Sequence, residues 1–248
     1  MDRMIYTALS GAKQSMQQQS VVSNNIANVS TTGFRAQLHA TRTAPMEGPG
    51  HLTRAFSVET TPGSDFSSGP LQSTGRALDV AIEGRGWLAV ETENGDTAFT
   101  RNGNLQVDAT GMLRSEGRPV LGDGGPVVVP LNAEVAIAPD GTVSAREPGT
   151  QVQAEVGQLM LTDYPAGNMQ RREDGLFNAL DEEGEPVEVV LRNENVRVAS
   201  GALEGSNVSA TEAMVAMIDV ARSYEMNMKV LSSADQTAQR ANSILSTS

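Results

Sequence analysis

The residues that could do chemistry in this chain are few, and carboxylates come first. Asp163, Glu173 and Asp174 could act as the acid and base of a glycan hydrolase if the fold brought two of them into one cleft. The acidic run 181–185 could be taken for a calcium loop, but it lacks the alternating ligand spacing of an EF-hand and fits a solvated hairpin tip. Because acidic residues are common in turns, neither group defines a site.

Other reactive residue types are scarce. The 248 residues include no cysteine and only two histidines, His39 and His51, which excludes thiol catalysis and thiolate zinc sites. Gly84-Arg85-Gly86 lacks the third glycine and the following helix of a nucleotide-binding loop. We therefore expect no enzyme activity, no cofactor and no metal. The 30 acidic against 18 basic side chains also argue against nucleic-acid binding, which needs a basic surface.

Glycine, proline and charge divide the chain into three parts. All 11 prolines lie within 45–186, and no glycine follows Gly205. Residues 1–45 contain four basic residues and one acidic residue, a net charge of +3, and residues 208–248 contain three basic and four acidic residues, a net charge of −1. Because the whole chain has a net charge of −12, the middle must have a net charge of −14. This distribution predicts helical ends around a turn-rich middle.

The two ends show helical periodicity. Apolar residues recur in three- and four-residue steps after Ile5, and again after a capping-box spacing at Ser209 and Glu212. A periodic segment longer than 25 residues suggests a coiled coil. The stripes could pack on the central domain, but narrow Met/Ala seams favour pairing of the ends with each other and with other subunits. The predicted assembly residues are Ile5, Leu9, Met16, Ile26, Met214, Met217, Tyr224, Met228, Leu231 and Leu245.

The middle is typical of β structure. Turn signals such as Asn94-Gly95, Asn102-Gly103 and Asp140-Gly141 recur every eight to ten residues between short β-branched runs. The predicted fold is therefore mainly β with long terminal α-helices, and a β-sandwich or barrel-like domain is inserted between helices that pair as a coiled-coil-like domain. We expect four segments: an N-terminal helix over 1–34, an extended connector over 35–75, the β domain over 76–205 and a C-terminal helix over 206–248.

Targeting segments are not evident. No run reaches 18 apolar residues, so we expect no membrane span. The first residues contain no apolar core of 7–15 residues, so we expect no cleaved signal peptide.

The most specific signal joins the first helix to the connector, in the string 24–35. Asn28 can bond the backbone at a helix end, Gly33 can take a positive φ, and Phe34 can anchor the exit. A helix C-cap followed by a Ser/Thr-rich loop accounts for part of this string. The whole string closely resembles the N-terminal signature of the flagellar basal-body rod and hook proteins, and segments 78–87, 99–105 and 203–208 resemble the same family in the same order. The family-motif residues are Asn24, Asn25, Ala27, Asn28, Gly33, Phe34, Gly205 and Asn207.

Within this family the chain looks like the proximal-rod branch. Its opening segment 1–9 is similar to that branch, and the residues after Arg35 lack the aromatic, acidic stretch of the distal-rod pattern. The resemblance implies a structural subunit of the rod, the axial drive shaft that crosses the periplasm and transmits torque. It implies that the terminal helices form the inner tube, that proximal and distal rod proteins and copies of the chain are partners, and that the flagellar type III apparatus exports it. The alternatives are another axial protein, of the distal rod or hook, and a secreted β-rich enzyme or adhesin module.

Overall fold

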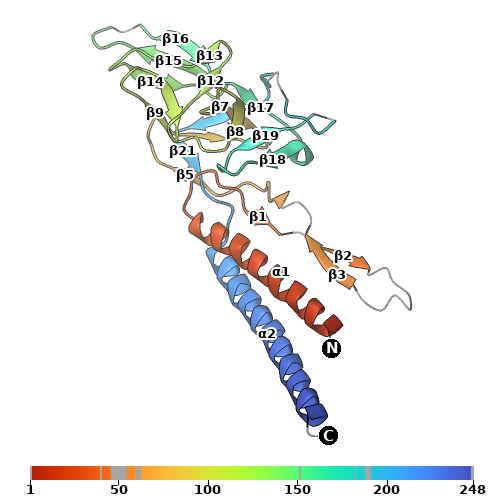
Figure 1. Ribbon diagram of the computed structural model, residues 1–248. Helices are drawn as coiled ribbons and strands as arrows, with labels where there is room; N and C mark the ends of the chain where they lie inside the picture. Colours follow the sequence, from red (N-terminus) through yellow and green to blue (C-terminus); the bar gives the residue numbers. More distant parts are fainter. Residues whose placement is uncertain are drawn as a thin grey trace. The chain divides into compact units, whose positions relative to one another are not determined.

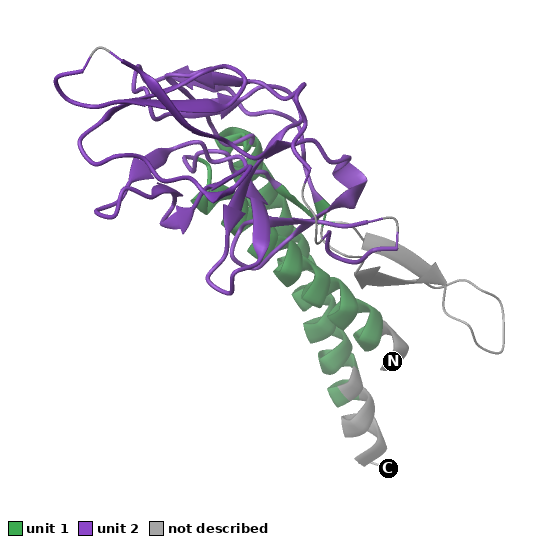
Figure 2. Ribbon diagram, turned by 90° about the horizontal axis from the view of Figure 1, so that it is seen from above, with its two compact units in different colours: residues 1–29, 37–63, 208–248 green, residues 30–36, 64–207 purple. Residues whose placement is uncertain are grey.

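The computed structural model describes residues 2–39, 41–45, 55–59, 63–150, 152–181, 183–187 and 191–246. The chain divides into two compact units, shown in green and purple in Figure 2. The helical unit comprises 1–29, 37–63 and 208–248, and the central unit comprises 30–36 and 64–207. These units divide the chain differently from the four predicted segments, because residues 30–36 belong with the β structure and 37–63 belong with the helices.

Two helices dominate the helical unit. α1 (Asp2–Ala27) has 26 residues and α2 (Ala210–Ser246) has 37. They run side by side and antiparallel, so the start of α1 lies at the same end of the helix pair as the end of α2 (Figure 1). The Ser209 hydroxyl accepts the backbone N–H of Glu212 at 3.4 Å, and it therefore supplies part of the predicted cap of α2. Two terminal helices are thus present, while the supercoiling of a coiled coil stays a prediction.

The predicted connector contains regular structure. Strand β2 (Thr41–Pro45) pairs antiparallel with β3 (Ala55–Glu59), and Thr41 lies opposite Glu59. The short strands β1 (Gln37–Leu38), β4 (Gly63–Ser64) and β5 (Leu71–Ser73) also fall in this region. An extended connector over 35–75 is therefore an incomplete description, because two β-rich runs within it pair with each other.

A five-stranded antiparallel sheet lies at the centre of the other unit. Its strand order is β17-β7-β8-β19-β18. These strands are β7 (Trp87–Glu91), β8 (Thr97–Thr100), β17 (Leu161–Thr162), β18 (Met169–Arg171) and β19 (Phe177–Ala179). In β7, the side chains of Trp87, Leu88, Ala89 and Val90 are all buried, so both faces of the sheet are covered.

Smaller sheets surround this one. The trios are β9-β10-β11 and β14-β15-β16, and the pairs are β12-β13, β6-β20 and β5-β21. Their bounds are β6 (Val80–Ile82), β9 (Leu105–Val107), β10 (Leu113–Ser115), β11 (Arg118–Pro119), β12 (Leu121–Gly122), β13 (Gly125–Pro126), β14 (Glu134–Ile137), β15 (Thr142–Arg146), β16 (Ala154–Gln158), β20 (Val198–Ser200) and β21 (Ala202–Glu204), with a 3-10 turn η1 (Ala166–Asn168).

Two hydrophobic clusters fill the central unit. The larger contains Leu88, Leu105, Leu113 and Leu159, each with no exposed surface, and the smaller is aromatic. In the aromatic cluster the rings of Trp87 and Phe177 lie 4.8 Å apart. Among the described residues these sheets do not close into a barrel, so the barrel-like expectation is wrong, and the sandwich arrangement stays a prediction.

Most of the predicted glycine turns are confirmed, and Gly86 and Gly103 are exceptions without a positive φ. Gly95 and Gly141, for example, have φ of 85° and lie between paired strands. Gly103 was also predicted as a turn residue, but its φ is not positive. A Cβ added to Gly103 would lie 1.7 Å from the carbonyl oxygen of Val80, so glycine is needed there for close backbone packing.

Candidate functional site: a helix surface and a buried junction

The buried face of α1 consists of small residues. Ala8, Ala12 and Ser15 are each less than 9% exposed, and they flank Gly11. A Cβ added to Gly11 would lie 3.0 Å from the side-chain amide of Asn227, so α1 and α2 approach closely there. The Ser15 hydroxyl donates to the Gly11 carbonyl at 3.0 Å, which satisfies its polar group inside the contact. On α2, the buried residues within the described part are Val220 and Ala234, which are two heptads apart.

Large apolar side chains on both helices remain exposed. On α1, Leu9 and Met16 are 55% and 61% exposed, and on α2, Met214 and Met228 are 55% and 43% exposed. Other predicted assembly residues are half-buried: Ile5, Ile26, Met217, Tyr224 and Leu231. The side chain of Leu245 lies outside the described part of the chain.

Four of the ten predicted assembly residues are therefore exposed and five are half-buried, so the helix pair covers the predicted set only in part. Sequence reasoning missed Ala8, Ser15, Val220 and Ala234 as contact residues, because it followed the largest apolar residues. The available signal was the run of small residues at positions 8, 11, 12 and 15. Further exposed apolar side chains adjoin the predicted set: Tyr6, Val215, Ile218, Met226 and Val230.

The family-motif asparagines end α1 and hold the following backbone. Asn28 donates from its side-chain amide to the Asn24 carbonyl at 2.9 Å, one residue past Ala27, where α1 ends. The Asn25 side chain donates to the Gln37 carbonyl at 2.9 Å and accepts the Gln37 N–H at 2.8 Å. Asn25 thus pairs with Gln37 as a neighbouring strand would.

Gly33 occupies a position that only glycine can fill. Its φ is 68°, and a Cβ there would lie 2.4 Å from the carbonyl carbon of Arg101. Its N–H donates to the backbone carbonyl of Glu204 at 2.7 Å. The predicted positive φ is confirmed. Glycine is required here for a second reason, because the backbone at Gly33 packs closely against the sequence-distant backbone at Arg101.

Beside Gly33, three charged groups form a buried junction. Glu204 has no exposed surface, and Arg35 and Arg101 are each 2% exposed. Glu204 Oε1 lies 2.8 Å from Arg35 Nη2, and Glu204 Oε2 lies 2.7 Å from Arg101 Nη2. Arg101 Nε donates to the same Oε2 at 2.8 Å, so two nitrogens of this guanidinium share one carboxylate oxygen. Burial lowers the pKa of Arg101 from its ordinary value, while the Glu204 charge opposes that change.

Asn207 extends this junction to three further segments. Its Oδ1 accepts the Ala36 N–H at 2.7 Å, and its Nδ2 donates to the carbonyls of Asp65 and Ser67 at 2.9 and 3.0 Å. The Asn207 N–H donates to the Phe34 carbonyl at 3.3 Å. Because Phe34 is buried and the Arg171 guanidinium lies 4.6 Å from the centre of its ring, the chain is fixed on both sides of Arg35.

Gly205 packs against the segment before β5. Its N–H donates to the Pro70 carbonyl at 2.8 Å, and a Cβ added to the facing Gly69 would lie 2.1 Å from the Gly205 carbonyl oxygen. The motif residues 33–36 and 204–207 therefore meet in one place, so these parts of the central unit are held by the residues that carry the family resemblance.

The carboxylates considered as reactive groups lie on the surface or in turns. Asp163, Glu173 and Asp174 are exposed, and Asp174 accepts the Leu176 N–H at 3.1 Å. Asp181 accepts the N–H groups of Glu183 and Glu185, both at 2.9 Å, as a turn residue does. Gly84 lies in the turn between β6 and β7 with a φ of 70°. His51 and Glu182 lie outside the described residues.

In the described part of the chain, no cluster of three or more histidine, aspartate or glutamate side chains is arranged to bind a metal ion. No helix there combines the length and the apolar character needed to cross a membrane.

Family models match three parts of the chain. They are described as "Flagella basal body rod protein" over residues 5–35, "Flagellar hook protein FlgE/F/G D1 domain" over 81–145 and "Flagellar basal body rod FlgEFG protein C-terminal" over 199–244. The first and third cover most of α1 and α2 together with Arg35 and Glu204, and the second covers Arg101 and much of the central β structure. The matches define the class as the axial rod and hook proteins of the flagellum.

Full-length relatives narrow this class. The chain is 47% identical to the flagellar basal-body rod protein FlgF of Escherichia coli (strain K12) and to that of Salmonella typhimurium, with 100% of each chain covered. It is 32% identical to the flagellar basal-body rod protein FlgG of Agrobacterium fabrum, covering 95% of this chain and 97% of that one. The chain belongs to the flagellar basal-body rod protein family, and it is a structural subunit of that rod.

Proposed function

We propose that this subunit joins the rod through the apolar side chains that α1 and α2 leave exposed after packing on each other. The observation that carries the proposal is the separation of two surfaces on each helix. Small residues at Ala8, Ala12 and Ser15 serve the contact within the subunit, whereas Leu9 and Met16 remain uncovered. Leu9 and Met16 are one heptad apart and so lie on one face of α1, and exposed apolar side chains gathered on one face mark an interaction site.

The chemistry of this helix surface suits repeated contacts among similar helices. Methionine is unbranched and polarisable, so Met16, Met214 and Met228 can adapt to neighbours that are similar but not identical. A filament grows when one surface binds a different surface on the next subunit and the rotation does not close. Interlocked helices joined in this way would give the rod the stiffness needed to transmit torque.

The test is a double substitution on the exposed face of α2. Met214→Asp with Met228→Asp should block rod completion, because two charges would have to be buried in an apolar contact. The matched control is Ser232→Asp with Gln236→Asp, which adds the same charge at two exposed polar positions of α2. Electron microscopy of basal bodies should show complete rods only in the control. Complete rods in both strains would refute the proposal, provided that circular dichroism shows a folded β unit in both proteins.

We also propose that the subunit occupies the proximal rod. The 47% identity to two relatives named FlgF, against 32% to a relative named FlgG, supports this assignment over the distal rod or hook. Labelling the subunit in purified basal bodies would test it. A label on the proximal segment is the expected result, and a label along the distal segment or the hook would contradict it.

We also propose a route of export for the subunit. The rod subunit would reach the periplasm through the flagellar type III apparatus, with its N-terminal helix retained for assembly. The intact mass of the subunit extracted from rods should then match the uncleaved chain. A mass lacking the first residues of α1 would contradict export without cleavage.

A further inference from the structure

The methionines whose side chains the structure describes differ sharply in exposure. Four of them on the helices are between 43% and 61% exposed, and we call these the exposed methionines: Met16 on α1, and Met214, Met226 and Met228 on α2. In the central unit, Met169 is 7% exposed and belongs to the aromatic cluster, while Met112 and Met160 are half-buried. An oxidant dissolved in water therefore reaches the exposed methionines more readily than those of the central unit.

Exposure matters because the thioether sulfur of methionine is readily oxidised. Hydrogen peroxide transfers one oxygen atom to the sulfur: the O–O bond breaks, an S–O bond forms, the sulfur loses two electrons and the peroxide is reduced to water. The product, methionine sulfoxide, is polar and accepts hydrogen bonds, whereas the thioether is apolar. One oxygen atom thus converts an apolar side chain into a polar one without breaking the chain.

The exposed methionines belong to the surface that we propose for assembly. Met214 and Met228 are two heptads apart and so lie on one face of α2, and Met16 is one heptad from the exposed Leu9 on α1. A sulfoxide buried in an apolar contact between subunits would lose its hydrogen bonds to water, which costs free energy. Oxidation therefore alters the surface that has to be buried when the subunit assembles.

We propose that the exposed methionines are a redox-sensitive modification site, at which peroxides oxidise the free subunit and so prevent it from joining the rod. This inference rests on the proposed function, because it needs the helix surface to be buried on assembly. Subunits already in the rod would be protected, since the contact that covers the thioethers also keeps the oxidant out. Reduction by a sulfoxide reductase, with two electrons from a thiol, would restore a competent subunit.

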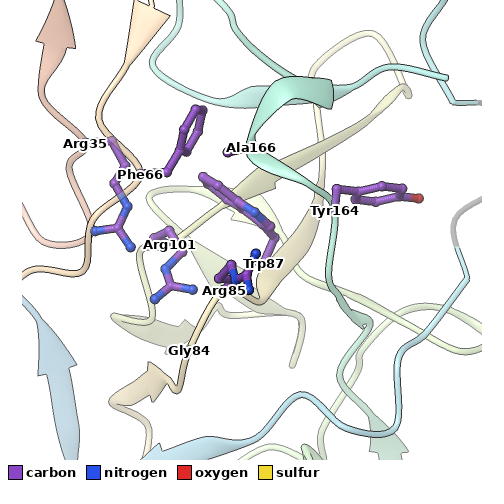
Figure 3. A pocket seen from close by; sticks show the side chains of 8 residues that line it. All are labelled: Arg35, Phe66, Gly84, Arg85, Trp87, Arg101, Tyr164 and Ala166. Carbon is purple, nitrogen blue, oxygen red and sulfur yellow. The ribbon is translucent and has the colours of Figure 1, made fainter. Parts of the chain in front are cut away.

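The central unit contains a reporter of its own folding. The single tryptophan of the chain, Trp87, is 3% exposed. It lines a small pocket together with Phe66, Arg85 and Tyr164 (Figure 3), and the volume of that pocket is about 20 Å³, room for about one water molecule. Constant Trp87 fluorescence during treatment with peroxide therefore shows that the central unit stays folded.

Peptide mapping by mass spectrometry tests the chemistry on the purified full chain in hydrogen peroxide. While Trp87 fluorescence is constant, the exposed methionines should form sulfoxide roughly ten-fold faster than Met169. In purified basal bodies, the same four residues should react as slowly as Met169. Equal rates at the exposed methionines and Met169 in the free subunit would overturn the proposal, and so would unchanged rates at the exposed methionines in the rod.

A leucine variant tests the effect of oxidation on assembly. Leucine is apolar, similar in volume and helix propensity to methionine, and contains no sulfur. The variant is Met16→Leu with Met214→Leu, Met226→Leu and Met228→Leu, and the control is Met160→Leu in the central unit. The readout is the fraction of complete rods that each strain loses in peroxide relative to the same strain without peroxide, so any effect of leucine on assembly itself cancels. That fraction should be roughly five-fold smaller in the leucine variant than in the wild type and unchanged in the control. Equal losses in the leucine variant and the wild type would overturn the proposal.

A glutamine variant imitates the sulfoxide without any oxidant. Glutamine is polar but has a helix propensity close to that of methionine, so Met16→Gln with Met214→Gln, Met226→Gln and Met228→Gln should give few complete rods. As many complete rods as in the wild type would overturn the proposal. The test of the proposed function separates the two failures. If Met214→Asp with Met228→Asp still blocks rod completion, only the redox inference fails, whereas complete rods in that variant as well would refute both.

Discussion

Arg35 and Glu204 form a buried ion pair, with 2.8 Å between Arg35 Nη2 and Glu204 Oε1, although they lie near opposite ends of the central unit's sequence. Each belongs to a segment that carries the family resemblance. The pair and its neighbours Gly33 and Asn207 therefore explain in physical terms why two sequence-distant motifs occur together.

The first prediction concerns the charge of Glu204. Glu204→Gln leaves two buried arginines without a carboxylate and should destabilise the central unit by about 3–5 kcal/mol. The control is Glu134→Gln, which breaks the exposed pair of Glu134 with Arg146 and should cost at most about 1 kcal/mol. Urea unfolding followed by Trp87 fluorescence measures both values. A loss at Glu204 no larger than at Glu134 would contradict the role of the buried charge.

The second prediction compares two glycines with similar backbone angles. Gly33 and Gly75 have φ of 68° and 71°, but only Gly33 has backbone atoms within 4 Å of an added Cβ. Gly75→Ala should cost about 1–2 kcal/mol, the strain of the left-handed conformation. Gly33→Ala should cost roughly 2 kcal/mol more, because the Arg101 backbone must move. Equal losses in thermal unfolding would show that the contact at Arg101 yields easily.

A third prediction concerns the helix pair in the free subunit. The buried residues of α1 are the small Ala8, Ala12 and Ser15, which bury little apolar area, so the helix pair should be only marginally stable before assembly. Hydrogen exchange on the purified subunit should show weak protection over 1–30 and 215–248. Strands β7 and β8 should be strongly protected, because Leu88 and Phe99 are fully buried. Equal protection in the helices and these strands would contradict the prediction.

The fourth prediction follows from the pKa of Asp108, in the turn between β9 and β10. Hydrogen bonds from Thr110 and Arg114 hold this pKa well below its ordinary value. Since the folded pKa is the lower one, the stabilisation is complete above the unfolded pKa near 4 and is lost as the pH falls through the folded pKa. Asp108→Asn should therefore be less stable at pH 7 and show a flatter decline below pH 4. An unchanged acid profile in urea unfolding would contradict this.

The sequence allowed the elements to be predicted better than their contacts. Periodicity located both helices, and the glycine turns located many of the short strands, because these signals act over a few neighbouring residues. The region of Val127 shows the limit: Val127 and Val129 are buried as a β-branched run predicts, yet they belong to no strand. Their hydrogen bonds depend on partners elsewhere in the chain.

The contacts that define the site depend on tertiary structure. Nothing local to Arg35 indicates that it pairs with Glu204. The predicted assembly set contains only large apolar residues, so it omits the small residues around Gly11. Two helices approach most closely where the facing side chains are small, as at Gly11, while Leu9, Met16, Met214 and Met228 stay exposed.

The position of Asn207 has a consequence for the order of folding. It closes the central unit by binding the backbone at Ala36, Asp65 and Ser67, near the beginning of that unit. These contacts join residues far apart in sequence. A chain that emerges N-terminus first therefore cannot make them until residue 207 has emerged. A fragment ending at residue 203 should consequently be cleaved by protease much faster than the full chain. Asn207 is the last residue of the central unit, so that unit can finish folding only more than 170 residues after its first residue has emerged.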